Sequence, residues 1–268
     1  MLCDYHVHST CSGDGHVSIE EMCARAVELG IGEIAFTEHF DGNPLDMSFG
    51  AFDYERYISE IEAARAKHGD LRILTGIEFG EPHVYPAQVE AVRAWNLDVV
   101  LAAVHWVGDT IVAVDQFHDA EHEALYDNYF SEVLKSVEAG GFDVLAHFDL
   151  VKRFGVRYAG PFDFGRFKER IAAILQAMIG RGIALEVNTS GLRQPCGETF
   201  PGTDTLRLYR DLGGEMVTIG SDAHRLDQLG FGLREGMALI EQAGFNTITR
   251  IQARRPEAVP LDVVLAAP

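Results

Sequence analysis

Two short segments carry side chains whose types and spacing suit metal coordination. The first, HVHSTCSGDGH (6–16), places four candidate ligands close together: His6, His8, Asp14 and His16. His6 and His8 are two residues apart, so on a β-strand both side chains point to one face. The second segment, GSDAH, gives Asp222 and His224 the same spacing. Imidazole nitrogens and carboxylate oxygens suit zinc, iron or manganese, so both segments predict metal ligation.

Strand-like apolar runs alternate with helix-length amphipathic segments along almost the whole chain. The predicted strands are residues 2–8, 33–37, 71–79, 97–105, 142–147, 183–188 and 215–221. The predicted helices are residues 18–30, 54–69, 85–96, 121–141, 164–182, 203–214 and 233–244. Strict alternation implies parallel strands joined by right-handed crossovers. We therefore expect an α/β fold, a closed or nearly closed TIM-like barrel in a single domain over residues 1–268. An open doubly wound sheet is the alternative.

Polar, ligand-type side chains stand at the end of every predicted strand. In chain order they are His6, His8, Asp14, Glu38, His39, Glu78, His105, His147, Asp149, Glu186, Asn188, Asp222 and His224. In a parallel α/β barrel these ends meet at one rim, where active sites form. So many carboxylates in one pit would repel one another without cations. A single catalytic zinc takes three protein ligands, so this number of donors predicts two or three metal ions.

Three other groups of residues are weaker candidates for chemistry. Cys11 lies within the first segment, but the four cysteines form no CxxC pair and predict free thiols in a reducing cytoplasm. His118 and His122 stand in the acidic stretch DQFHDAEHE, which is typical of a solvated helix start. The connection at 106–121 has few periodic signals and is a candidate lid or wall of the site.

The charge and hydropathy of the chain limit its partners. The formal net charge is −19, with 41 acidic and 22 basic residues, which disfavours binding to nucleic acid. No apolar run approaches the roughly 20 residues of a membrane-spanning helix, and no secretory signal is visible at the start. We therefore expect a cytoplasmic protein that acts on a small substrate, without a nucleic-acid or membrane partner.

The motifs HVHSTCSGDGH, TEHF, TGIEFG, VHW, AHFDL and GSDAH occur in this order, and with them the chain resembles the PHP (polymerase and histidinol phosphatase) superfamily. EVNTSGLR (186–193), AHFDLVKRFG and GSDAHRLDQLGFG look most like the monofunctional histidinol-phosphatases of that superfamily. The resemblance implies a distorted (β/α)7 barrel that carries a trinuclear metal centre.

The resemblance also implies which residues hold the metals, in three groups. The first group is His6, His8, Glu78 and Asp222. The second is Glu78, as a bridging carboxylate, with His105 and His147. The third is Asp14, His39 and His224. Many relatives have a histidine at the position of Asp14, so His16 remains an alternative ligand for the third group.

The reaction that the resemblance implies is hydrolysis of L-histidinol phosphate to L-histidinol and phosphate, a step of histidine biosynthesis. Zinc, manganese or iron ions would hold a bridging hydroxide that attacks the phosphorus in line. Asp222 or His224 would assist the leaving alkoxide, and Arg193, Lys152 and Arg153 follow strands and would bind the phosphate. The acidic groups Glu38 and Asp149 are candidates to face a cationic alcohol.

Three other functions fit the sequence less well. A phosphatase or phosphodiesterase of the PHP type that acts on nucleotides or other small phosphate esters is the alternative. A non-catalytic binding module should have lost ligands, and every expected position keeps a competent residue. The acidic surface also disfavours a proofreading nuclease domain of a polymerase.

Overall fold

The computed structural model describes residues 2–114 and 122–265, and its centre is one sheet of parallel strands. In spatial order the strands are β1 (Leu2–Val7), β2 (Ile31–His39), β3 (Arg72–Gly80), β4 (Val99–Ala103), β7 (Val144–Leu145), β8 (Ala184–Asn188) and β9 (Val217–Gly220). The two edge strands meet through a parallel bridge between Val7 and Ala223. The backbone N–H of His8 donates to the carbonyl of Ala223 over 2.8 Å. The sheet is therefore a nearly closed barrel of seven parallel strands, as the sequence predicts.

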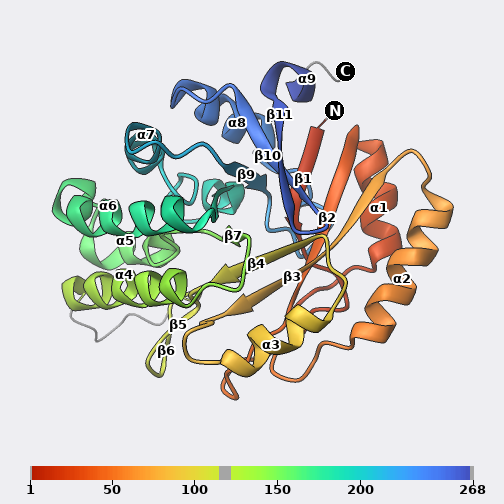
Figure 1. Cartoon of the computed structure of the whole chain (residues 1–268), viewed down its shortest axis with the longest axis horizontal. Helices are drawn as coiled ribbons and strands as arrows, with labels where there is room; N and C mark the ends of the chain where they lie inside the picture. The colour runs from red at the N-terminus through yellow and green to blue at the C-terminus, as the bar shows by residue number, and fades with distance from the viewer. Residues whose placement is uncertain (1, 115–121, 266–268) are drawn as a thin grey trace.

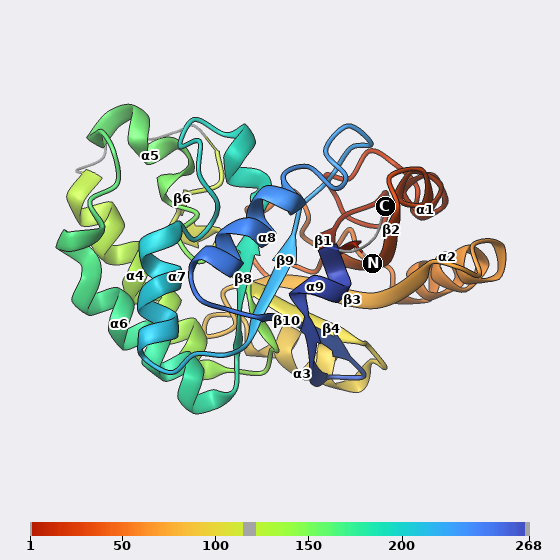
Figure 2. The same cartoon turned by 90° about the horizontal axis from the view of Figure 1, so that it is seen from above.

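Helices surround this barrel on its outside (Figures 1 and 2). They are α1 (Ile19–Glu28), α2 (Tyr54–Lys67), α3 (Pro86–Ala94), α4 (His122–Ala139), α5 (Lys152–Ala159), α6 (Phe164–Arg181), α7 (Thr203–Asp211), α8 (Leu233–Gln242) and α9 (Leu261–Leu265). Each predicted strand and helix overlaps one of these elements. Among the residues that the structure describes, no helix has the length and apolar character needed to cross a bilayer.

Local sequence signals explain where several helices begin and end. Ser18 and Glu21 form a capping box at the start of α1, in which each side chain accepts a backbone N–H of the other residue. The Asp163 side chain accepts the backbone N–H of Arg166 at the start of α6. Gly182 ends α6 in the left-handed conformation, with φ 67°, which glycine adopts without strain. These signals fix the ends of helices that connect successive strands of the barrel.

The structure contains elements that the sequence did not predict. They are the hairpin of β5 (Trp106–Val107) and β6 (Thr110–Ile111), helices α5 and α9, the 3-10 helix η1 (Thr189–Arg193), and the hairpin of β10 (Thr247–Gln252) and β11 (Arg255–Pro260). The candidate lid at 106–121 thus begins as a β-hairpin. Residues 115–121, with His118, lie outside the described residues.

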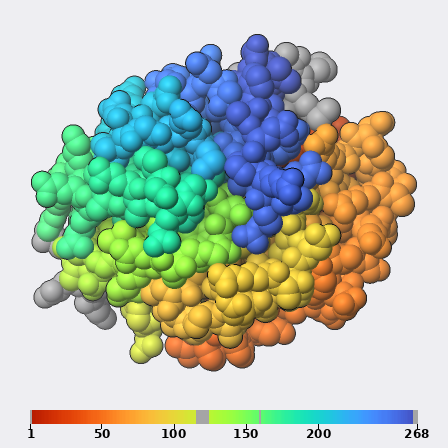
Figure 3. All heavy atoms as spheres, in the orientation of Figure 1, coloured from red at the N-terminus to blue at the C-terminus, as the bar shows by residue number. Residues whose placement is uncertain are grey.

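The β10–β11 hairpin covers the end of the barrel at which the strands begin. Arg250 pairs with Glu33 near the start of β2 over 3.1 Å, and the N–H of Arg254 donates to the carbonyl of Asp98, just before β4. Figure 3 shows the blue atoms of this C-terminal region lying across that face. At the opposite end, where the strands finish, the described residues leave a cavity that opens between the loops.

Candidate metal centre

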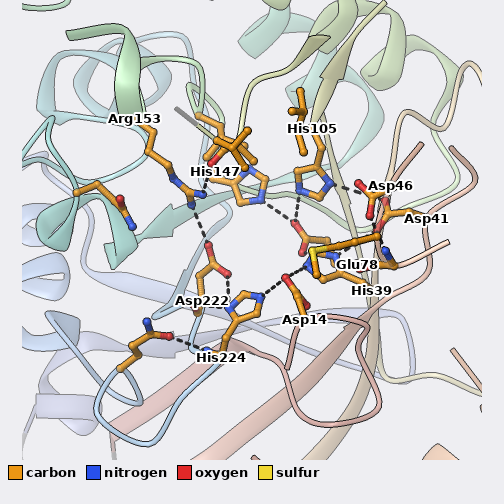
Figure 4. A pocket seen from close by; sticks show the side chains of 18 of the residues that line it. Asp14, His39, Asp41, Asp46, Glu78, His105, His147, Arg153, Asp222 and His224 are labelled. Carbon is orange, nitrogen blue, oxygen red and sulfur yellow. Dashed lines mark hydrogen bonds and ion pairs between the residues drawn. The ribbon is translucent and has the colours of Figure 1, made fainter. Parts of the chain in front are cut away.

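A cavity of about 460 Å³ lies at the open end of the barrel, where the strands finish. Nine ligands were predicted from the sequence, and the structure brings all of them to this cavity or directly beneath it: His6, His8, Asp14, His39, Glu78, His105, His147, Asp222 and His224. Figure 4 shows the labelled members of this set pointing toward one common space. Residues far apart in the sequence therefore form a single cluster of nitrogen and oxygen donors.

In the first predicted group, the Nε2 atoms of His6 and His8 are buried and lie 3.0 Å apart. Glu78 Oε2 lies 3.2 Å from Nε2 of His6 and 3.4 Å from Nε2 of His8. Asp222 Oδ1 lies 3.8 Å from His6 Nε2 and 3.6 Å from His8 Nε2. Two imidazole nitrogens and two carboxylate oxygens thus converge on one point, an arrangement that suits a divalent cation.

Glu78 connects this group to the second one. Its Oε1 atom lies 2.7 Å from Nε2 of His147 and 3.5 Å from Nε2 of His105. One oxygen of Glu78 therefore faces the first group and the other faces the second. This is the geometry that a bridging carboxylate requires.

The third group has Asp14 at its centre. Asp14 Oδ2 lies 3.1 Å from Nε2 of His224 and 3.6 Å from Nε2 of His39. His16 is exposed at the rim, and its backbone N–H donates to the carbonyl of His224. Both Asp14 and His16 line the cavity, and Asp14 has a carboxylate oxygen within 3.6 Å of the imidazoles of both His39 and His224.

The charges of the cluster also fit a cation. Burial lowers the pKa of His8 to about 3, helped by His224 and His39, so its ring is neutral and ready to act as a ligand. Burial raises the pKa of Glu78, but His6 and His147 outweigh it and hold this pKa well below its usual range. Burial lowers the pKa of His6, His39 and His105 as well, but neighbouring carboxylates outweigh it and raise these pKa values well above the usual range, so a bound metal ion would displace protons from these rings.

Two of these donors occupy strained backbone positions. His147 has φ 25° and Asp222 has φ 54°, both in the left-handed region that side chains disfavour. Such conformations cost on the order of 1–3 kcal/mol each and cluster at functional sites. Each of these residues lies two positions after the end of a short strand, β7 or β9, and its side chain lines the cavity.

Buried partners outside the cluster hold the ligands in place. Glu186 Oε1 accepts Nδ1–H of His6 over 2.6 Å, and its Oε2 accepts the backbone N–H of His147 over 2.7 Å. The Ser190 hydroxyl and the Asn188 amide lie 3.2 Å and 3.4 Å from Asp222 Oδ2. Carboxylates and amides of this kind fix the tautomer and direction of a metal ligand.

Sequence reasoning missed Asp41, which is buried between His39 and His105. These three residues also form a group whose donor atoms lie within 4.8 Å of one another. The only available signal was its position two residues after His39, the spacing already noted for the two pairs of predicted ligands.

The predicted phosphate-binding cations fall into two classes. Arg153 and Arg193 line the cavity, and Arg153 lies 3.6 Å from Asp222 Oδ2. Arg193 donates to the backbone carbonyls of Ser221 and Asp222 over 2.8 Å and 2.7 Å. Lys152 is buried away from the described lining of the cavity, so the structure contradicts its predicted place at the mouth.

The two acidic side chains expected to face a cationic alcohol have other partners. Asp149 Oδ2 lies 3.0 Å from the buried ammonium of Lys152. Glu38 accepts hydrogen bonds from the Ser9 backbone N–H and from the hydroxyls of Ser9 and Ser12, so it orders the loop after β1. Neither residue is among the described residues that line the cavity.

Comparison with known families identifies this arrangement. The model of the PHP domain matches residues 4–190. The chain belongs to the PHP domain family. A probable histidinol-phosphatase of Deinococcus radiodurans is 28% identical over 262 residues, which cover 92% of this chain and 96% of that protein. A histidinol-phosphatase of Lactococcus lactis is 28% identical, over 91% of this chain and 92% of that protein.

Two solved structures have a similar fold over most of this chain. The histidinol phosphate phosphatase of Lactococcus lactis, complexed with zinc, L-histidinol and phosphate, superposes with a TM-score of 0.86 at 26% identity. The match covers 96% of this chain and 98% of that one. A putative histidinol phosphatase from Listeria monocytogenes has a TM-score of 0.75 at 22% identity, over 87% of this chain and 99% of that one, and supports the fold alone.

Proposed function

We propose that this chain is a metal-dependent phosphomonoesterase that hydrolyses L-histidinol phosphate to L-histidinol and phosphate. The observation that carries the proposal is that Glu78 joins two donor groups where the strands of the barrel finish, with the third group around Asp14 beside them. The similar Lactococcus lactis protein holds zinc, L-histidinol and phosphate together, which supports both the metal and the substrate.

We assign the metal ligands as the sequence predicts them. His6, His8, Glu78 and Asp222 would hold one ion, Glu78, His105 and His147 a second, and Asp14, His39 and His224 a third. Zinc, manganese or iron ions bound there would activate water as a nucleophile and draw charge from the phosphoryl oxygens. The distances between the donor atoms of each group support this assignment.

The other residues of the cavity bind and orient the substrate. Arg153 places its guanidinium beside Asp222 and therefore beside the first group, where a phosphate bound to metal would meet it. Arg193 acts mainly by holding the Ser221–Asp222 backbone, with its Nε atom free of hydrogen bonds among the described residues. Asp222 and His224 line the cavity and are our candidates to assist the departing alkoxide.

A direct test is phosphate release from L-histidinol phosphate beside a panel of nucleotides and sugar phosphates. The protein is first reconstituted with zinc, manganese or iron. We expect the highest kcat/KM for L-histidinol phosphate. A preference for a nucleotide would retain the metal centre and the reaction type but overturn the proposed substrate.

We also propose a cytoplasmic location for the enzyme. The cysteines Cys3, Cys11, Cys23 and Cys196 are all free thiols, three of them buried. Free thiols are usual in a reducing compartment. Measuring the protein in fractionated cells tests this point, and recovery outside the cytoplasm would contradict it.

A further inference from the structure

Asp41 lies between two histidines that belong to different proposed metal groups. Its Oδ2 atom is 3.4 Å from Nδ1 of His39, a ligand of the third group. Its Oδ1 atom is 3.7 Å from Nδ1 of His105, a ligand of the second group. The carboxylate is buried, so no bulk water competes for these nitrogens. The Asp41 carboxylate thus faces the Nδ1 atom of both rings.

The hydrogen-bonding state of these atoms indicates that they belong together. Oδ2 of Asp41 and Nδ1 of His39 are both buried and have no hydrogen-bond partner within the described part of the chain. Glu78 Oε2 also lies 3.4 Å from this nitrogen, but Glu78 is already engaged by His6 and His147. Buried polar atoms are rarely left unpaired, so Asp41 is the free acceptor for His39.

The backbone beside Asp41 is adapted to its presence. The N–H of Gly80, at the end of β3, donates to Asp41 Oδ1 over 2.8 Å. A Cβ atom at position 80 would lie 2.7 Å from Oδ1 of Asp41 and 3.5 Å from Nδ1 of His105. Such a close approach is possible only for glycine, and a side chain there would push the carboxylate away. Glycine at position 80 thus leaves room for the Asp41 carboxylate in its present position.

The opposite nitrogens of the two rings face the metal groups. Nε2 of His39 lies 3.6 Å from Asp14 Oδ2, and Nε2 of His105 lies 3.5 Å from Glu78 Oε1. A carboxylate that accepts Nδ1–H holds a histidine in the tautomer whose Nε2 atom can bind a metal. Asp41 imposes this tautomer on two rings at once.

We propose that Asp41 is a positioning residue that couples the second and third metal groups by accepting Nδ1–H from both His39 and His105. The proposal rests on the metal ligands assigned to the proposed function. Under this proposal, the ions of the second and third groups both depend on the Asp41 carboxylate. Loss of this carboxylate should therefore weaken two metal sites together, whereas loss of a ligand from one group weakens that group.

The test measures zinc bound by the purified protein, without any substrate. Wild type, Asp41→Asn, Gly80→Ala and Asp14→Asn are dialysed against graded zinc concentrations set by a competing chelator, and bound zinc is counted by mass spectrometry. Asp46→Asn is the matched control, because Asp46 lies in the same loop and accepts Nε1–H of Trp106. Circular dichroism verifies that each variant is folded.

We expect Asp41→Asn and Gly80→Ala each to weaken two zinc sites by about 10- to 100-fold. Asp14→Asn should weaken one site, and Asp46→Asn should bind zinc as the wild type does. Nitrogen NMR of the histidine rings should show Nδ1–H at His39 and His105 in the zinc-bound wild type, and a change at these rings in Asp41→Asn.

Two results would overturn the coupling. One is wild-type zinc affinity in both Asp41→Asn and Gly80→Ala. The other is the loss of a single site in these variants, as in Asp14→Asn. Gly80→Ala retains every carboxylate and histidine, so it tests the geometry even if Asp41→Asn does not fold. None of these readouts uses histidinol phosphate, so failure of the proposed substrate would not affect them.

Discussion

Nδ1 of His6 and Oε1 of Glu186 lie 2.6 Å apart, and both side chains are buried. Burial lowers the pKa of His6, but the carboxylates of Glu186, Glu78 and Asp222 outweigh it and raise this pKa well above its usual range. The contact with Glu186 keeps a proton on Nδ1 and leaves Nε2 directed at the first metal group. The function of a residue on β8 is thus to fix a ligand on β1.

Glu186→Gln removes the charge that holds this tautomer while keeping the size of the side chain. We expect metal affinity of the first group to fall by about 10- to 100-fold, with kcat/KM falling in parallel at limiting metal. Chelator competition measures the affinity. Glu20→Gln, at an exposed ion pair on α1, is the control. Equal zinc affinity in the two variants would show that Glu186 has no role in metal binding.

Arg153 and Arg193 should respond differently to truncation. Arg153 reaches the first group with its guanidinium, so Arg153→Ala should raise KM by about 10- to 100-fold, the worth of a charge-assisted hydrogen bond of roughly 1.5–3 kcal/mol. Arg193→Ala releases the backbone carbonyls of Ser221 and Asp222 and should lower kcat as well as raise KM. Steady-state kinetics separates the two effects, with Arg255→Ala at the far end of the barrel as the control. If Arg193→Ala raised KM and left kcat unchanged, Arg193 would bind phosphate only, and its proposed role in holding the Ser221–Asp222 backbone would be wrong.

Removal of metal should lower the thermal stability of the protein. The ionised carboxylates of Asp14, Glu78 and Asp222 converge in one cluster, so cations that bind only the folded state stabilise it. At a free metal concentration 100 times Kd, each site contributes about 2.7 kcal/mol. Scanning calorimetry with and without a chelator measures Tm, and added zinc should restore it. Identical Tm values in both conditions would contradict metal binding by this cluster.

Lys152→Met tests the ion-pair network that buried Lys152 forms with Asp149 and Glu198. The ammonium of Lys152 lies 3.0 Å from Asp149 and 3.1 Å from Glu198, so its removal leaves a buried carboxylate uncompensated. We expect the free energy of unfolding to fall by about 3–5 kcal/mol. Urea denaturation measures this change. Lys67→Met, which breaks the exposed pair with Glu20, should cause little change, and a similar small effect at Lys152 would argue against the network.

The sequence predicted the strands and the cluster well because both depend on local rules. Buried parallel strands appear as continuous apolar runs, and their C-terminal ends must share one rim. His6, Glu78 and Asp222 could therefore be placed together although they are far apart along the chain. The PHP family match and the Lactococcus lactis structure confirm the family and the fold.

Other features depend on contacts that the sequence does not display. The β10–β11 hairpin turns through Ala253 and Arg254, both with positive φ, instead of the Asn-Gly or Asp-Gly pair that marks such turns. Lys152 stands next to Arg153, but the start of α5 directs one side chain into the core and the other to the cavity. The direction of a side chain at a helix start depends on packing that no local pattern reveals.

The barrel closes between its first and last strands at the bridge of Val7 and Ala223, beside which the N–H of Asp222 donates to the carbonyl of His6 over 2.8 Å. His6 and His8 lie on one side of that junction, and Asp222 and His224 lie on the other. During synthesis, His6 and His8 leave the ribosome long before Asp222 and His224. A growing chain therefore carries an incomplete first group until Asp222 has been synthesised. The first and last strands of the sheet can therefore pair, and the proposed first metal group can be completed, only after β9 and Asp222 have been synthesised.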